Sequence, residues 1–247
     1  MKPNFKILGV LIGLLLFSCT EDGIVNETEM TTTPIQNTAK PSRGVSEKLW
    51  NFDSLNEWED ATQVGDKNYS IENGILTMFT NANSWDRTKI KSAATYTTGA
   101  YSWRVYVPAM GIGDKASIGA FLYNDDTHEL DFEIGYGQQS VRELLNASSD
   151  DLLVYTTSQA NPFRSEARKI KREQWYTLSI ELTLNSKNKY IANWKIDGNS
   201  IQTLQLNYGT RENFKIFCSV ENLQFIGDHI PNSQNYALFD FVEYRGN

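Results

Sequence analysis

Short segments in which apolar and polar residues alternate run through most of the chain after residue 47. Alternation with a period of two is typical of β-strands that bury one face, because successive side chains of a strand point to opposite sides. Asn73-Gly74 and Asp197-Gly198 favour tight hairpin turns, and each pair lies between two such segments. We therefore predict an all-β sandwich built from the segments 69–79, 100–108, 116–123, 129–136, 175–184, 189–206, 214–220 and 236–244.

The nearest approach to a helical pattern lies between residues 141 and 155. Leu144, Leu145 and Leu152 fit one side of a short helix in this stretch. Asn and Ser residues interrupt it, and their side chains compete for the hydrogen bonds of a helix. No long helix is therefore predicted.

The first 18 residues have the layout of a secretory signal. Lys2 and Lys6 lead into an apolar run that is too short to span a bilayer comfortably, and the run ends in Leu-Phe-Ser-Cys at positions 16–19. These four residues resemble a bacterial lipobox, which implies removal of residues 1–18 and lipid attachment at Cys19. The acidic pair just after Cys19 resembles a signal for export to the outer membrane. The alternative is a plain secretory signal with a chance cysteine.

Residues 20–46 contrast with the rest of the chain, because they have almost no large apolar side chains and many Thr, Asn, Glu and Pro residues. Such a composition favours a flexible tether. We predict three parts: a signal peptide over residues 1–18, a lipidated Cys19 and tether over 19–46, and one folded domain over 47–247. The expected location is the bacterial cell envelope, with the lipid at Cys19 holding the protein in a membrane.

Composition narrows the choice of partners. The chain has 247 residues, a formal net charge of -7 and a pI near 5.0, which disfavours nucleic acid, because phosphate binding needs clustered Lys and Arg. Its 12 Tyr, 12 Phe and 6 Trp can form a core and can also stack on sugars. Cys218 has no predicted disulfide partner once Cys19 is lipidated, and we expect it to be a small buried residue.

Three carboxylates occupy alternate positions of one predicted strand, at Glu129, Asp131 and Glu133. They share one face of that strand, where neighbouring like charges repel and destabilise a sheet. Like charges held close together cannot all ionise freely, so at least one of the three pKa values should be raised. The row therefore indicates a function rather than ordinary surface.

Two carboxylates can cleave a glycosidic bond with retention when they lie about 5 to 5.5 Å apart. Glu129 and Glu133 are about 13 Å apart along the backbone at the usual rise of a strand, and side chains that lean together can close much of that gap. A solvated acidic face without function and a calcium site are the alternatives, since three carboxylates also suit a hard cation.

The row resembles the Glu-x-Asp-x-Glu signature of glycoside hydrolase family 16, a group of concanavalin A-like jelly rolls that includes lichenases, laminarinases and agarases. Further segments are similar to strands of that family, and together they run from about residue 48 to 244. The resemblance implies a jelly-roll β-sandwich of two antiparallel sheets. The similar segments are 97–108, 116–137, 175–182, 192–201 and 239–244.

The resemblance also implies roles for the three acids: Glu129 as nucleophile, Asp131 as its assistant and Glu133 as acid/base. The implied activity is that of a retaining endo-β-glycosidase, which cleaves a polysaccharide of the β-glucan or galactan class at the cell surface. We expect a monomer that binds polysaccharide or oligosaccharide and requires no cofactor. No metal ligand is assigned, although a structural calcium ion away from the cleft is compatible with the family.

Four further residues are predicted to bind substrate. The resemblance places Arg104, Tyr123 and Phe121 in the cleft, with core packing as the competing interpretation of Phe121. Trp85 is added on exposure grounds, because a Trp between Ser and Asp in a polar loop is rarely buried.

The chain departs from the family pattern at three expected contact positions, where it carries Ser102, Thr127 and Glu221 instead of a Glu, a Trp and a Trp. These departures support an alternative function, a non-catalytic carbohydrate-binding surface lipoprotein with the same fold. A structural module without a sugar ligand is a third possibility, and it predicts that Trp85 and Tyr123 are buried.

Overall fold

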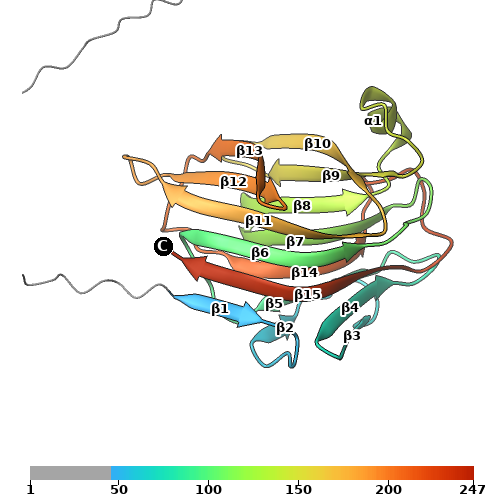
Figure 1. Cartoon of the computed structure of the whole chain (residues 1–247), viewed down its shortest axis with the longest axis horizontal. Coiled ribbons are helices and arrows are strands. Elements are labelled where there is room, and N and C mark those ends of the chain that lie inside the picture. Colours follow the sequence, from blue (N-terminus) through green and yellow to red (C-terminus); the bar gives the residue numbers. More distant parts are fainter. Residues whose placement is uncertain (1–45) are drawn as a thin grey trace, which may run out of the picture. The chain divides into compact units, whose positions relative to one another are not determined.

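The computed structural model of the chain describes residues 46–247, which form two antiparallel β-sheets packed face to face (Figure 1). Its elements, in chain order, are β1 (Glu47–Trp50), β2 (Trp58–Asp60), β3 (Tyr69–Glu72), β4 (Ile75–Thr80), β5 (Arg87–Ser92), β6 (Gly99–Val107), β7 (Ala116–Asp125), β8 (His128–Gly135), α1 (Gln139–Leu144), β9 (Asp151–Ser158), β10 (Arg164–Lys171), β11 (Gln174–Leu184), β12 (Tyr190–Ile196), β13 (Asn199–Gln205), β14 (Lys215–Asn222) and β15 (Asn235–Gly246). Within this range no helix is long and apolar enough to cross a membrane.

One sheet has eight strands and the other has seven. The first, which we call the β6 sheet, has the order β13-β12-β11-β6-β15-β4-β3, and β1 also pairs with β15. The second, the β8 sheet, has the order β10-β9-β8-β7-β14-β5-β2. Strands distant in sequence are therefore neighbours, and β8 lies near the middle of its sheet. The predicted all-β sandwich is confirmed.

Hairpin turns appear where the sequence predicts them. Asn73 and Gly74 join β3 to β4 with φ angles of 51° and 75°, and Asp197 and Gly198 join β12 to β13 with 48° and 78°. Two consecutive positive φ angles are the requirement of a type I′ turn, whose twist matches that of paired strands. These turns fix the register of both hairpins.

The core fills the space between the two sheets. Trp103, on β6, donates its Nε1 hydrogen to the carbonyl oxygen of Phe217, on β14, at 3.0 Å. Trp194, on β12, donates in the same way to the carbonyl oxygen of Asp131, on β8, also at 3.0 Å. Both indole rings are fully buried, so each combines a large apolar area with a hydrogen bond that ties one sheet to the other.

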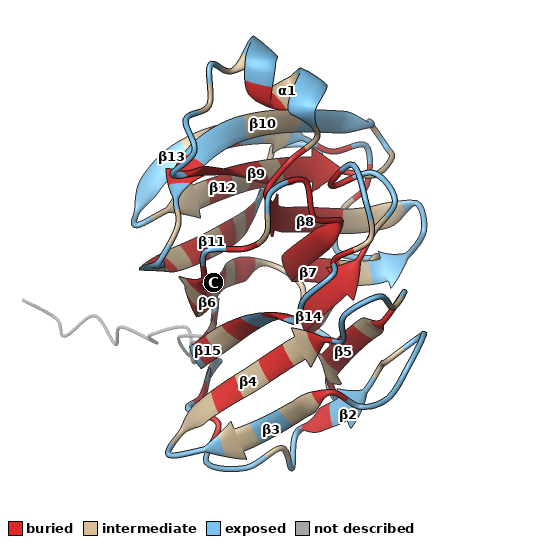
Figure 2. Ribbon diagram, turned by 90° about the vertical axis from the view of Figure 1, so that its right-hand side faces the viewer, coloured by how far each residue is buried: buried red, intermediate tan, exposed pale blue. Residues whose placement is uncertain are grey.

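Burial is deep along β7, β8, β9 and β14, and β7, β8 and β14 are red over most of their length in Figure 2. In these strands most residues of both faces have little exposed surface, whereas β6 and β4 alternate between buried and intermediate positions. Cys218 lies fully buried on β14, as predicted.

Within residues 46–247 the structure agrees with the expectation that no long helix forms. Residues Gln139–Leu144 form α1, but Leu152 belongs to strand β9. Strands β1, β2, β5, β9 and β10 lie outside the segments that the sequence predicted. The predicted signal peptide, the lipidation at Cys19 and the tether over 19–46 fall on residues outside the described range, apart from Ser46.

Candidate active site

The three acids of β8 share the face that points away from the core. Leu130, Phe132 and Ile134 alternate with them and are fully buried between the sheets. β8 pairs with β7 on one side and β9 on the other, so its acids lie within a wide sheet rather than at an edge. We call Glu129, Asp131 and Glu133 the acid row.

The acid row forms part of the floor of a cleft with a volume of about 440 Å³. Glu129 and Glu133 line it, while Asp131 lies between them and is only 1% exposed. The other lining residues come from the strands beside β8 and from nearby loops: Ala61, Gln63, Arg87, Lys89, Lys91, Phe121, Tyr123, Asp126, Gln159, Phe217, Glu221, Leu223 and Phe225.

Small residues lie beside Glu133 across the sheet. Strand register places Glu133 opposite Gly119 on β7, then Ser219 on β14, then Lys89 on β5. A Cβ atom at Gly119 would lie 3.3 Å from Oε1 of Glu133 and would also collide with the Ser219 hydroxyl. The absence of a side chain at Gly119 therefore makes room for the Glu133 carboxyl.

Aromatic residues lie beside Asp131 in the next row. The order there is Asp131, Phe121, Phe217 and Lys91. The rings of Phe121 and Phe217 stack with centroids 4.6 Å apart and an interplanar angle of 16°. Both rings line the cleft and give it an apolar surface next to the acids.

Burial raises the pKa values of all three acids. It raises the pKa of Glu129 to about 7, where Lys89 pulls it down and Glu221 pushes it up. It raises the pKa of Glu133 to about 8, with Glu221 adding to the rise and a hydrogen bond from Ser117 opposing it. Both acids therefore titrate close to neutral pH.

Asp131 is the most deeply buried acid. Burial and the charges of Glu129 and Glu133 raise its pKa well above the ordinary value of an aspartate. Its Oδ2 accepts a hydrogen bond of 2.7 Å from Nε2 of Gln159, while its buried Oδ1 has no hydrogen-bond partner among residues 46–247. If Asp131 carries its proton on Oδ1, this oxygen becomes a hydrogen-bond donor instead of an acceptor without a partner.

A basic row on β5 faces the same cleft. Arg87, Lys89 and Lys91 occupy alternate positions and all line the cavity. The carboxylate of Glu221, on β14, is buried and accepts from Nε of Arg87 at 2.6 Å and from Nζ of Lys89 at 2.8 Å. Glu221, which replaces an expected aromatic, thus adds a carboxylate to the cleft beyond the acid row.

Two predicted substrate residues do lie in the cleft. Phe121 and Tyr123 line it from β7, and Tyr123 is only partly buried. Trp85 is 47% exposed, as predicted, but lies outside the cavity lining, with Nζ of Lys115 5.3 Å from its ring centroid. The burial that a purely structural module predicted for Trp85 and Tyr123 is not found.

The predicted position of Arg104 was wrong. Arg104 lies on β6, in the sheet opposite the cleft, where alternate positions fill the core and leave Arg104 on the outer face. Its Nη1 lies 3.3 Å from Oγ1 of Thr177 and 3.9 Å from Oδ1 of Asp197. Ser102 has the same orientation and bonds to Ser179, so it is not a cleft position either.

Thr127 lies in the exposed turn between β7 and β8, where its amide and hydroxyl both donate to Oδ1 of Asp125. Sequence reasoning gave no role to Gly119, Lys91 or Gln159, named Lys89 only as one of several basic residues that could bind a sulfated galactan, and treated Glu221 only as a lost aromatic. The alternation of Arg87, Lys89 and Lys91 was a usable signal for a second charged strand face.

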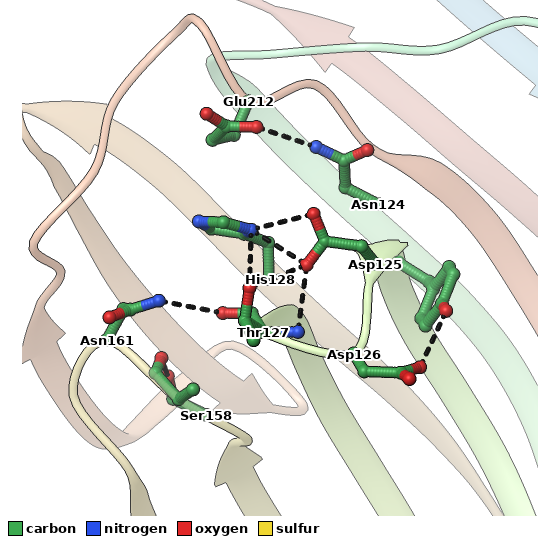
Figure 3. Close-up of polar contacts among 10 residues, drawn as sticks. Asn124, Asp125, Asp126, Thr127, His128, Ser158, Asn161 and Glu212 are labelled. Atoms are coloured by element: carbon green, nitrogen blue, oxygen red, sulfur yellow. Dashed lines mark hydrogen bonds and ion pairs between the residues drawn. The ribbon is translucent and has the colours of Figure 1, made fainter.

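One cluster beside the β7–β8 turn has donor atoms suited to a metal ion (Figure 3). Ligand atoms of Asp125, His128 and Glu212 lie within 4.8 Å of one another, and Nδ1 of His128 is already 2.9 Å from Oδ1 of Asp125. An imidazole with two carboxylates suits a transition metal better than calcium, which prefers oxygen ligands. The cluster is therefore a poor match for the structural calcium ion that the family resemblance allows.

Searches against protein-family models and against curated proteins find no match to this chain. Comparison with solved structures does find similar folds. A Crh5 transglycosylase has 14% identity and a TM-score of 0.59, covering 81% of this chain and 84% of its own. A β-glucanase of Bacillus licheniformis has 15% identity and a TM-score of 0.58, covering 83% of this chain and 100% of its own.

Porphyranase B of Zobellia galactanivorans is also similar, with 13% identity and a TM-score of 0.54, covering 85% of this chain and 97% of its own. At such identities these likenesses concern the fold. The described domain has the jelly-roll fold of the glycoside hydrolase family 16 glucanases, and this confirms the predicted fold class.

Proposed function

We propose that this protein is a retaining endo-β-glycosidase that cleaves a polysaccharide of the β-glucan or galactan class. The acid row supports this proposal: Glu129 and Glu133 line one cleft, with the buried Asp131 between them. Such an arrangement provides a nucleophile and an acid/base that can flank a scissile glycosidic bond. The fold shared with a β-glucanase and a porphyranase agrees with it.

In this mechanism Glu129 attacks the anomeric carbon while Glu133 protonates the departing glycosidic oxygen. Glu133 then takes a proton from the water that releases the glycosyl group from Glu129. The pKa values suit these roles, since Glu133, at about 8, holds its proton at neutral pH more firmly than Glu129, at about 7. Asp131 assists by sharing a proton with Glu129 through its unpartnered oxygen.

The ligand in this proposal is a saccharide. Similar structures include a Crh5 transglycosylase in complex with NAG and a Bacteroides ovatus family 16 enzyme in complex with the product G4G4G3G. In this chain Phe121, Phe217 and Tyr123 offer ring surface beside the acids, where the apolar face of a sugar can pack. We further propose lipid anchoring at Cys19, a tether up to residue 46, an outer-membrane location, a monomeric state and no required cofactor.

Release of reducing ends tests the proposal. The full chain is incubated with β-glucans, xyloglucan, agarose, porphyran and carrageenans, beside its Glu129→Gln variant. The matched control is Glu181→Gln, which removes a carboxylate from β11 of the β6 sheet, where Glu181 pairs with Lys195. We expect release by the wild type and by the control, and none by Glu129→Gln.

Two results would contradict the proposal. Near-normal release by Glu129→Gln would remove the nucleophile from its assigned role. Binding of a glycan by the wild type without release from any polysaccharide would favour the non-catalytic carbohydrate-binding alternative.

A further inference from the structure

The basic row of β5 lies in the cleft but has no part in the double displacement. We propose that this end of the cleft is a subsite for an acidic substituent of the glycan, either a sulfate ester or a carboxylate. The inference rests on the proposed function in taking the ligand to be a glycan, and it adds the chemical class of that glycan.

Strand register places the basic row directly across from the acid row. Lys89 is in line with Glu133, and Lys91 is in line with Asp131, with β7 and β14 between them. Three strand spacings amount to about 14 Å. An extended oligosaccharide bound across the sheet can therefore contact the acids at one end and the cations at the other.

Along the basic row and the adjoining start of β14, cations outnumber the carboxylates that pair with them. Arg87 and Lys89 share the one carboxylate of Glu221. Lys91 and Lys215 share that of Glu59, at 3.6 and 3.2 Å. Four cationic groups therefore meet two carboxylates, although the chain as a whole carries a charge of -7. An acidic ligand group would balance this local excess.

The guanidinium group of Arg87 is positioned so that it can bind an acidic group of the ligand. Its bond to Glu221 uses Nε, and within the described range no hydrogen bond involves its two terminal nitrogens. Its side chain is 37% exposed, and that of Lys91 is 31% exposed. The planar fork of a guanidinium matches the paired oxygens of a sulfate or carboxylate, and a lysine beside it adds charge.

Lys89 has a different part in the subsite. Its side chain is only 6% exposed, and its ammonium group lies against Glu221. Lys89 and Glu221 thus form a buried pair that orients the Arg87 guanidinium from below. Lys89 is a positioning residue in this proposal, while Arg87 and Lys91 contact the ligand.

Calorimetric titration of the full-length Glu129→Gln variant tests the inference, because this protein binds without turnover. The probes form two pairs: carrageenan oligosaccharides and their desulfated counterparts, and a curdlan oligosaccharide oxidised to carboxylates at C6 and its unoxidised parent. We expect one acidic probe to bind at least about tenfold more tightly than its neutral partner, with an advantage that shrinks in salt. The pair that shows the difference identifies sulfate or carboxylate.

Substitution then locates the subsite. Adding Arg87→Gln or Lys91→Gln should remove most of the preference for the acidic probe, while Arg87→Lys should retain part of it. Lys187→Gln, on the exposed turn between β11 and β12, is the control and should retain it fully. Thermal unfolding of each variant checks that the fold is kept.

The outcomes separate this inference from the proposed function. Equal binding within both pairs, or no binding to any probe, overturns the inference, and hydrolysis of a neutral polymer by the wild type would leave the glycosidase proposal standing. A preference that survives both glutamine substitutions also overturns it. A preference lost in both variants supports the subsite even if the wild type hydrolyses nothing, a result that would contradict only the glycosidase proposal.

Discussion

The acid row of β8 and the basic row of β5 are built alike and neutralised differently. Each places three like charges at alternate positions of one strand, facing one cleft. The cations form ion pairs with carboxylates, chiefly Glu221, whereas no salt bridge in the described part of the chain involves an acid of β8. The acids are accommodated by raised pKa values instead. The ion-paired cations of β5 stay charged and can bind an acidic ligand. The acids of β8, whose pKa values are raised, can take up and release protons.

The largest expected loss of activity comes from substitutions in the acid row. Substrates with different leaving groups distinguish the role of Glu133 from that of Glu129. Glu133→Gln should lower kcat/KM on polysaccharide by about a thousandfold, because the departing oxygen loses its proton donor. The loss should be much smaller for an aryl glycoside whose leaving group needs no proton. Glu129→Gln should be inactive on both substrates. Equal losses for both variants on both substrates would contradict the separate roles.

Removing the carboxylate that the basic row shares should cost stability. Glu221→Gln leaves Lys89 buried without its partner, so we expect the free energy of unfolding to fall by about 4 kcal/mol. Denaturant unfolding measures it. The pH profile of activity should also move to lower pH, because the Glu221 charge raises the pKa values of Glu129 and Glu133. A double variant with Lys89→Met should recover part of the stability and should move the profile back towards higher pH, because the Lys89 charge lowers the pKa values of Glu129 and Glu133.

The acid row should make the protein less stable as the pH rises. The pKa of Glu133 is raised to about 8 in the folded chain from an ordinary value of 4.5. Its favourable contribution is therefore fully present below about pH 4.5 and is lost as the pH rises through about 8. Glu133→Gln should remove that dependence and be more stable than the wild type at pH 9, by on the order of 3 kcal/mol. Parallel curves of unfolding free energy against pH would contradict this.

The smallest expected effects concern Trp103 and Trp194, the two tryptophans that connect the sheets. Trp194→Phe and Trp103→Phe each remove one indole hydrogen bond between the sheets, so each should lower the free energy of unfolding by about 1 to 2 kcal/mol. Trp194 bonds to the backbone of Asp131 in the acid row, whereas Trp103 bonds to β14. Only Trp194→Phe should therefore also lower kcat. An equal change of kcat in both variants would show that this anchor does not position the acids.

Short sequence patterns correctly predicted the features that neighbouring residues determine, namely strand faces and hairpin turns. The period of two placed Glu129, Asp131 and Glu133 on one face, and the Asn-Gly and Asp-Gly pairs predicted hairpins that the structure contains. Strand β5 was missed because Arg87, Lys89 and Lys91 occupy its alternate positions, which hides a strand from a search for apolar segments. Leu152 also fitted a helical spacing, although it lies in β9, because short apolar runs fit both periods.

The errors at the site come from long-range pairing. Arg104 lies on β6, and only β7 separates β6 from the acid strand β8 along the chain. Nevertheless, β6 and β8 belong to opposite sheets. No local signal in the sequence says which sheet a strand joins. The register that brings Gly119 and Ser219 beside Glu133, and Lys89 beyond them, depends on β14 lying between β7 and β5, strands that are distant in the chain. Glu221 became a cleft residue through the same pairing.

The cleft also depends on the absence of a side chain at Gly119, a steric requirement that does not involve charge. Because the Glu133 carboxyl occupies the space above a residue with no side chain, the added methyl group of alanine would compete with it for volume. Every acid and every cation would remain in the sequence, and the cleft would still be shallower at the point where a proton must be delivered. The catalytic capacity of this sheet thus depends on an empty volume as much as on its carboxylates.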